Sequence, residues 1–489
     1  MNVRASIYWS MAQRYGAFVI TFVTTVIVSR ILTPTEIGIY SLAAVVMHLA
    51  ATFRDFGMYE YLVQEKTVNR DTLATSLAVT LSVAVVLALA LWGSSSFIAE
   101  WYAEPGLERL INLLAVNFLI IPLASQSFNM MSREMRFKEL FFIHTASTTL
   151  GATVTISAAL LGFSYMSAAW GTVVASVFST IVMLIYRPRD SWLMPRFRGS
   201  GKAYRFGFFA MGSTALGNVS SVIHESIIGR VLGFHALGLF SRGYGLLSQF
   251  QGTVVAAIQR VALPAFSNAR RDGESLVPGY LRATAILSGV SWPFFSVVAI
   301  QAHNLIPFLF GDQWDLAVPI VRIVAVAAAF KALSQFAHPL LAACGRPDIR
   351  MKIYGTSAVA YLFMVIGAVQ VSLIAVAWAY VVLCSIQTLM FHSSVKNLIG
   401  ISARTLLASV RQSLLVTIFV AATVLAIELL MSWAGAAPTV RLFSSAVVAT
   451  AIFLLAMHAF AHPFWREIRS LWDSLLVRLA AFRQPNERG

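Results

Sequence analysis

Charge is scarce in this sequence, and that scarcity argues against an ordinary soluble domain. Only 12% of the 489 residues are charged and 58% are hydrophobic, whereas a soluble domain carries about 25% charged residues. Acidic residues are the scarcer kind, since 21 Asp and Glu stand against 36 Lys and Arg, a formal net charge of +15. A basic excess can indicate nucleic-acid binding, but here the basic residues fall mostly in short loops between apolar segments. That placement is typical of a polytopic membrane protein, so we expect no nucleic-acid partner.

Cysteine is nearly absent, and so are the motifs of common enzymes. The two cysteines, Cys344 and Cys384, lie in or beside apolar segments and predict neither a disulfide framework nor a metal site. No His, Cys or carboxylate cluster has metal-ligand spacing. No glycine-rich phosphate loop, nucleotide-binding motif or nucleophile elbow occurs. We therefore expect no cofactor, no metal and no catalytic residues. The first apolar segment continues to Arg30 without a small-residue cleavage site, so we expect it to remain as a helix.

Long apolar runs are abundant. A membrane-spanning helix needs about 20 mostly apolar residues, and fourteen segments of this kind can be found. Their approximate ranges are 8–30, 38–63, 74–99, 109–131, 141–163, 166–186, 206–230, 236–263, 283–302, 316–343, 353–370, 373–391, 412–433 and 440–462. The tail after them has apolar residues near one helical face, which suits a helix on the cytoplasmic membrane surface or one packed on the protein's own loops.

The loops between these segments alternate in charge. Loops that follow even-numbered segments carry most of the basic residues, and the longest of them is 187–205. Loops that follow odd-numbered segments hold few, and the one at 100–108 is acidic. Because basic loops stay in the cytoplasm, the pattern predicts a multi-pass membrane protein with both termini inside. A missed helix would break the alternation downstream, and we find no break.

A repeat relates the two halves of the chain. Residues 29–41 read SRILTPTEIGIYS and residues 229–241 read GRVLGFHALGLFS. The matches at an offset of 200 include Gly38 with Gly238 and Ser41 with Ser241. Membrane proteins built from two related halves usually hold their substrate between them. The repeat therefore indicates a transporter.

The predicted fold is all-α and polytopic, with about 14 transmembrane helices in two pseudo-symmetric six-helix lobes plus two C-terminal helices. We predict an N-lobe over 1–186, a basic cytoplasmic linker over 187–205 and a C-lobe over 206–396. The two further helices occupy 397–462, and an amphipathic cytoplasmic tail occupies 463–489.

Polar side chains inside the apolar segments mark the candidate substrate site. A charge at the centre of a spanning helix costs about 2.5–3.5 kcal/mol on insertion scales and is usually functional or paired. The candidate substrate-binding residues are Arg14, Arg54, Arg242, Gln249, Arg260, Lys331 and Gln335, and Asp55 and Glu225 are candidates for ion coupling. A basic excess facing a cavity attracts an anion, and the arginine fork suits phosphate.

A structural role is the alternative for several of these side chains. Arg242 and Arg260 lie near the ends of their segment, where long side chains can reach the membrane interface. Arg54 has the adjacent Asp55 and the nearby Glu60 as pairing partners. Lys331 is too deep in its segment to reach the interface easily, so we expect it to face a wet cavity.

Six stretches of the sequence together resemble the polysaccharide flippases (Wzx type) of the multidrug/oligosaccharidyl-lipid/polysaccharide exporter superfamily. They are SRILTPTEIGIYSLA at 29–43, FRDFGMYEYLVQ at 53–64, SREMRFKEL at 132–140, GRVLGFHALGLFSRGY at 229–244, RVALPAFS at 260–267 and LFGDQWDLAVPIVRI at 309–323. The resemblance covers most of residues 10–395, and the last two segments share only hydrophobicity with the family.

This resemblance implies transport of undecaprenyl-diphosphate-linked oligosaccharide from the cytoplasmic to the periplasmic leaflet. The product would be exopolysaccharide, capsule or O-antigen, moved by alternating access around a cationic cavity. The implied partners are the lipid-linked oligosaccharide, membrane lipid and the polysaccharide polymerase and chain-length or export proteins, with the transporter itself monomeric. A cation-coupled multidrug exporter, a membrane enzyme and a scaffold without transport are the alternatives. An exporter of cations should line its cavity with carboxylates, and an enzyme should have a clustered acid/base set.

Overall fold

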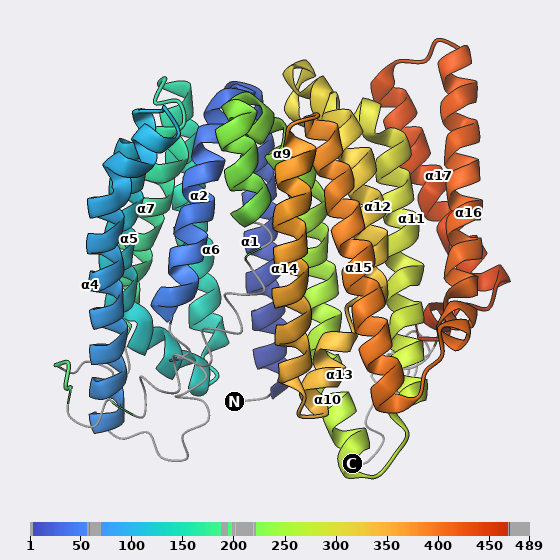
Figure 1. Cartoon of the computed structure of the whole chain (residues 1–489), viewed down its shortest axis with the longest axis horizontal. Coiled ribbons are helices and arrows are strands. Elements are labelled where there is room, and N and C mark those ends of the chain that lie inside the picture. The colour runs from blue at the N-terminus through green and yellow to red at the C-terminus, as the bar shows by residue number, and fades with distance from the viewer. Residues whose placement is uncertain are drawn as a thin grey trace, which may run out of the picture. The chain divides into compact units, whose positions relative to one another are not determined.

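The computed structural model describes residues 3–55, 58, 70–186, 194–197, 201, 219, 222–467 and 469. Helices account for nearly all of this part of the chain (Figure 1). The first half contains α1 (Val3–Ile31), α2 (Pro34–Asp55), α4 (Arg70–Trp101), α5 (Gly106–Arg133), α6 (Phe137–Leu160) and α7 (Met166–Ile185). The second half contains α9 (Gly233–Phe250), η1 (Gln251–Val255), α10 (Ala256–Arg271), α11 (Leu276–Phe310), η2 (Asp312–Ala317), α12 (Val318–Ser334), α13 (Ala337–Ala343), α14 (Pro347–Val369), α15 (Leu373–Ile399), α16 (Ala403–Trp433) and α17 (Pro438–Ala459).

Twelve of the fourteen predicted spans coincide with helical segments of the described residues, and the span 38–63 coincides with α2 as far as Asp55 and then lies largely outside the described residues. The remaining span, 206–230, falls largely outside the described residues, although 222–230 are helical. Eleven helices in the described part of the chain are long and apolar enough to cross a membrane. The all-α membrane fold is therefore confirmed. Most of the predicted linker and of the predicted tail lies outside the described residues.

Two of the predicted spans are not continuous α-helices. The span 236–263 contains the π-helical turn η1 between α9 and α10, and the span 316–343 is divided between α12 and α13. Pro339 explains the second interruption. Proline has no N–H to donate to the carbonyl four residues before it, and its ring crowds that carbonyl. The residue in question is Gln335, where α12 ends.

The described residues form two compact units. Unit 1 comprises 1–242, 309–314 and 358–376, and unit 2 comprises the remaining residues. In unit 1, α6 packs against both α1 and α7, while α5 packs against α4 and α7. In unit 2, α16 and α17 form an antiparallel pair (Figure 1). The lobe boundaries expected from the sequence remain a prediction.

The turn that opens the first repeat copy is stabilised by its own sequence. Thr33 precedes α2, and both its backbone N–H and its hydroxyl donate to Glu36 Oε2, at 2.7 and 2.8 Å. The Thr33 hydroxyl in turn accepts from the Glu36 N–H at 3.4 Å. This reciprocal arrangement is a capping box, and Pro34 occupies the first helical position, where its missing N–H costs nothing. The chain therefore reverses direction between α1 and α2 within three residues.

The two repeat copies contact each other in unit 1. A Cβ atom added to Gly38 of α2 would lie 1.9 Å from the carbonyl oxygen of Phe234, and one added to Gly238 of α9 would lie 1.9 Å from the carbonyl oxygen of Pro34. The hydroxyls of Ser41 and Ser241 are hydrogen-bonded at 2.9 Å. The matched glycines therefore let the backbones of α2 and α9 meet directly.

The helix that precedes each repeat copy is also held at its end by contacts with distant side chains, and these contacts are similar for the two copies. Beside the first copy, Gln313 Nε2 and Trp314 Nε1 donate to the Ser29 carbonyl at 2.7 and 2.9 Å. Beside the second, the Tyr102 hydroxyl donates to the Ser226 carbonyl at 3.3 Å, and Trp101 lies under Arg230, 5.3 Å from its guanidinium carbon. Each helix end is thus held by side chains that come from the other half of the sequence.

Candidate functional site

A cavity of about 930 Å³ lies within unit 1. Side chains from α1, α2, α4, α5, α6, α7 and α9 line it. The lining residues of α6 recur at three- and four-residue intervals, from His144 to Thr155, and those of α7 do so from Ala168 to Met183. This spacing places them along one face of each helix. The walls of the cavity are thus formed by continuous faces of these helices, so its lining side chains stand on rigid elements.

Hydroxyl groups dominate the polar part of this lining. Twelve of the 31 lining residues are Ser or Thr, and Tyr40, Tyr165 and Asn129 add three more polar side chains. No Asp, Glu or Lys occurs among the described residues that line the cavity. Hydroxyls both donate and accept hydrogen bonds, so this surface suits a polar ligand without positive charge.

Two arginines provide the positive charge of the cavity. Arg54, in the last turn of α2, stands over the Phe118 ring, 5.5 Å from its centroid. Arg242 of α9 lies 5.9 Å from the centroid of Trp314, and its Nε atom makes no hydrogen bond to the described residues. Guanidinium groups bind phosphate oxygens through paired hydrogen bonds. The guanidinium groups of Arg54 and Arg242 can therefore contribute to binding an anion.

The structure brings some of the predicted site residues together. Arg54 and Arg242 line the same cavity. Arg242 is the tenth residue of α9 and faces this cavity. Arg14 is half-buried on α1 and is not among the lining residues.

The other predicted residues belong to unit 2 or lack a described side chain. Gln249 is half-buried on α9, and Gln335 is buried at the end of α12. Arg260 lies on α10 and Asp55 ends α2, but both of these side chains are outside what the structure describes. Their predicted roles stay predictions.

Lys331 occupies the last turn of α12 and is half-buried. The groups that act on it electrostatically are the side chains of Tyr244, Tyr354 and Cys384. None of the ion pairs among the described residues involves it. The role of Lys331 in binding an anion stays a prediction.

Glu225 is almost fully buried, with 8% of its surface exposed. Its Oε1 atom lies 4.0 Å from Nε2 of the fully buried His224. The His224 ring packs against Phe240 and Tyr361, at centroid distances of 5.0 and 6.1 Å. A buried carboxyl beside an imidazole is a suitable place to hold a proton, which is compatible with the predicted ion-coupling role.

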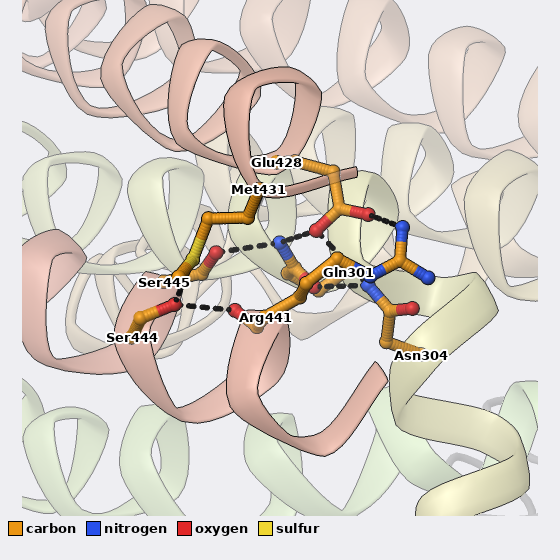
Figure 2. Close-up of polar contacts among 7 residues, drawn as sticks. All are labelled: Gln301, Asn304, Glu428, Met431, Arg441, Ser444 and Ser445. Atoms are coloured by element: carbon orange, nitrogen blue, oxygen red, sulfur yellow. Dashed lines mark hydrogen bonds and ion pairs between the residues drawn. The ribbon is translucent and has the colours of Figure 1, made fainter. Parts of the chain in front are cut away.

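Sequence reasoning missed a polar cluster in unit 2 that joins α11, α16 and α17 (Figure 2). Arg441 Nη1 donates to Glu428 Oε1 at 3.0 Å. Gln301 and Asn304 each donate through their side-chain nitrogen to Glu428 Oε2, at 2.9 and 3.0 Å, and Gln301 also donates to the Ser445 hydroxyl at 2.8 Å. The carboxylate is thereby satisfied on both oxygens. The sequence did contain a signal for this cluster, because Glu428 and Arg441 have opposite charges and lie on either side of the turn between the last two helices.

No group of three or more His, Cys, Asp or Glu side chains that could hold a metal ion occurs in the described part of the chain.

Comparison with known proteins agrees with this description. A family model described as polysaccharide biosynthesis protein matches residues 27–319. The lipopolysaccharide biosynthesis protein WzxC of Escherichia coli K12 is 23% identical over 412 residues, which cover 82% of each chain. The succinoglycan biosynthesis transport protein ExoT of Rhizobium meliloti is 26% identical over 395 residues, which cover 78% of each chain.

Among solved structures, the inward closed conformation of the lipid II flippase MurJ has a similar fold. The TM-score is 0.74, the sequence identity is 13%, and the match covers 94% of this chain and 99% of that one. At this identity the match shows the fold alone. The family match covers more than half of the chain and confirms the resemblance found in its motifs. The chain is therefore a multi-span membrane protein that belongs to the family described as polysaccharide biosynthesis protein.

Proposed function

We propose that this protein moves undecaprenyl-diphosphate-linked oligosaccharide repeat units from the cytoplasmic to the periplasmic leaflet of the bacterial inner membrane. The observation that carries the proposal is the cavity of unit 1, which is rich in hydroxyls, contains Arg54 and Arg242, and has no carboxylate among its described lining residues. The arginines suit the diphosphate, and the hydroxyls suit the sugars. The prenyl tail can stay in the lipid. The protein acts as a transporter and not as an enzyme.

Alternating access is the proposed mechanism. In transporters with two related halves, movement of one half against the other exposes the site to each side in turn. Lys331 adds positive charge in unit 2, and Gln249 and Gln335 offer polar contacts there. Asp55 and Glu225 are the proposed coupling groups, since protonation of a carboxyl changes its charge within the membrane. Contacts with the polymerase and with chain-length or export proteins complete the proposed pathway.

The cation-coupled multidrug exporter remains the second candidate. A cationic drug needs negative charge at its site, and the lining of the described cavity contains none. The lining therefore favours an anionic substrate over a cationic one.

The orientation follows from the alternation of loop charge. We expect residue 103 to lie in the periplasm and residue 194 in the cytoplasm, with both termini cytoplasmic. Ala103 and Met194 are both exposed. In a chain without Cys344 and Cys384, Ala103→Cys should react with an impermeant maleimide in intact spheroplasts, and Met194→Cys only after permeabilisation. The opposite labelling pattern would show an inverted topology.

Deletion of the gene tests the function directly. A strain without the protein should lose surface polysaccharide and accumulate lipid-linked repeat units that face the cytoplasm. Complementation with Arg54→Ala or Arg242→Ala should restore little polymer, because charge-assisted hydrogen bonds contribute about 1.5–3 kcal/mol each. Arg109→Ala is the matched control, since Arg109 is exposed on α5 and does not line the cavity. Normal polymer output from the deletion strain, with no paralogue present, would contradict the proposal.

A further inference from the structure

Two helices supply a large share of the hydroxyls in the cavity. Seven of them, which we call the hydroxyl wall, come from α6 and α7: Ser147, Thr148, Thr155, Thr172, Ser176, Ser179 and Thr180. The two helices approach closely at a pair of glycines. A Cβ atom added to Gly171 would lie 2.6 Å from the Gly151 carbonyl oxygen and 1.9 Å from Thr155 Oγ1. This close approach makes the wall one continuous surface rather than two separate helix faces.

Several hydroxyls around the cavity donate their proton in a hydrogen bond to a backbone carbonyl of their own helix. Ser147 Oγ donates to the His144 carbonyl at 3.0 Å, and Thr172 Oγ1 donates to the Ala168 carbonyl at 2.8 Å. Thr24 of α1 and Ser125 of α5 do the same within their own helices, at 2.7 and 2.8 Å. A hydroxyl that donates to its own helix keeps lone pairs that accept hydrogen bonds. The lining therefore offers acceptors to a ligand that brings its own O–H or N–H donors.

The positive charge of the cavity comes from other elements. Arg54 belongs to α2 and Arg242 to α9, and neither α6 nor α7 contributes a Lys, Arg, Asp or Glu to the lining. A phosphate brings acceptors and negative charge, so it needs the arginines and gains little from hydroxyls that already donate their proton to their own helix, as those of Ser147 and Thr172 do. A sugar has a dense set of hydroxyl donors and no such need for charge. The two kinds of lining thus match the two kinds of polar group in a diphosphate-linked oligosaccharide.

The size of the cavity is suited to the saccharide. Ligand sites that enclose drug-sized molecules have volumes of roughly 300–1,000 Å³, and this one measures about 930 Å³. The space therefore accepts several sugar rings.

We propose that the hydroxyl wall of α6 and α7 is a saccharide subsite, in which acceptor hydroxyls bind the sugar hydroxyls of the repeat unit and select which repeat unit is carried. The inference rests on the proposed function and extends it. It assigns the sugars to α6 and α7 and leaves the diphosphate to the arginines of α2 and α9.

Isosteric removal of the hydroxyls tests the subsite. The triple variant Thr148→Val, Thr172→Val and Ser176→Ala keeps the approximate side-chain volume and removes three lining hydroxyls. The matched control is Thr149→Val with Thr153→Val, since both of these threonines are exposed on α6 and neither lines the cavity. Each variant is expressed as the sole flippase in the deletion strain, and its amount in the membrane is measured. The purified full-length protein is also titrated with geranyl diphosphate, which carries the diphosphate but no sugar.

The triple variant should lower polymer output by about tenfold or more, because each neutral hydrogen bond changes binding by a factor of about 2 to 10. Its affinity for geranyl diphosphate should stay within about twofold of wild type, and the control variant should match wild type in both measurements. Wild-type output from the triple variant, in a host where deletion abolishes polymer, would overturn the subsite while the proposed function stands. Loss of geranyl diphosphate binding in the triple variant would also overturn it, because the wall would then not be specific to sugar. If wild-type protein does not bind geranyl diphosphate and deletion leaves polymer output normal, the proposed function itself fails.

Discussion

At the residue scale, His462 shows how one buried imidazole orders the end of the helical bundle. Its side chain is fully buried just beyond α17, outside the membrane-spanning segments. Nδ1 accepts from the Phe464 N–H at 3.1 Å. The Ser413 hydroxyl lies 3.0 Å from Nε2 and donates its own proton to the Ala285 carbonyl. The ring is therefore neutral, with its proton on Nε2, and it fits only because Gly289 has no Cβ, which would lie 2.4 Å from the ring.

This arrangement predicts a loss of stability in acid. Burial lowers the pKa of His462 from 6.5 to about 4. Between these values the unfolded chain binds the proton more tightly than the folded chain does, so stability rises with pH across this window and falls as the pH drops through it. The thermal unfolding midpoint of the purified protein should decrease from pH 6.5 to pH 4, and His462→Gln should remove part of that decrease. Parallel curves for wild type and variant would show that His462 does not contribute.

The polar cluster in Figure 2 gives a second residue-scale prediction. Glu428 and Arg441 are largely buried, with 17% and 15% of their side-chain surface exposed. Arg441→Ala leaves a buried carboxylate without its cation, and breaking such a pair costs as much as about 3 kcal/mol. The unfolding midpoint should therefore fall, whereas Arg411→Ala, at an exposed site on α16, should leave it unchanged. If Glu428→Ala, Arg441→Ala and the double variant have additive effects, the two side chains are not coupled.

Residues of the candidate site differ in how far their roles can be predicted from sequence. Arg54 and Arg242 could be identified because a charge inside an apolar segment is costly and therefore conspicuous. The hydroxyls of α6 and α7 could not, because a Ser or Thr satisfies its hydroxyl on its own helix at little cost. Such residues occur in spanning helices with or without a function. Only the folded structure shows which of them face one cavity.

At the scale of elements, the contact between α2 and α9 explains why the repeat keeps its glycines. Each of Gly38 and Gly238 faces the backbone of the other helix at a distance that no side chain tolerates. The sequence alone matched these residues by their offset of 200, but it could not show that they touch. The interruption between α12 and α13 is a different case. Pro339 is visible in the sequence, but the residues around it are apolar throughout. Apolar length alone therefore predicted one continuous helix over 316–343.

Gly38→Ala and Gly238→Ala should each impair the protein severely. The added methyl group must separate the two helices, and overpacking of this kind costs about 1–3 kcal/mol. Polymer output from the deletion strain complemented with either variant should therefore be low. Gly245→Ala is the control, because Gly245 lies on the same helix, α9, and an added Cβ meets nothing within 4 Å. Equal output from all three variants would show that the close contact is not required.

At the scale of the whole molecule, apolar length predicted most of the helices, since twelve of the fourteen expected spans coincide with helical segments of the described residues. Apolar length and loop charge are two independent signals of a spanning helix, which is why the all-α membrane fold could be predicted. The division into units was not predictable in the same way. Unit 1 takes in residues 309–314 and 358–376 from the second half of the chain, and contacts so distant in sequence leave no periodic pattern.

Alternating access makes a further prediction about the two repeat copies. If the halves move against each other during transport, the contact between Ser41 and Ser241 must open and close in each cycle. Their hydroxyl oxygens lie 2.9 Å apart. The sulfur atoms of two cysteines at these positions can therefore approach to the S–S bond length of about 2.05 Å. The variant Ser41→Cys with Ser241→Cys, in a chain without Cys344 and Cys384, should form a disulfide on oxidation. That covalent link should stop polymer export, and a reductant should restore it.

Each single cysteine variant should export normally under both conditions, which separates the effect of the link from the effect of the substitutions. Undiminished export by the fully cross-linked protein would show that α2 and α9 stay together throughout the cycle, and transport would then have to proceed without separation of the repeat copies at this contact.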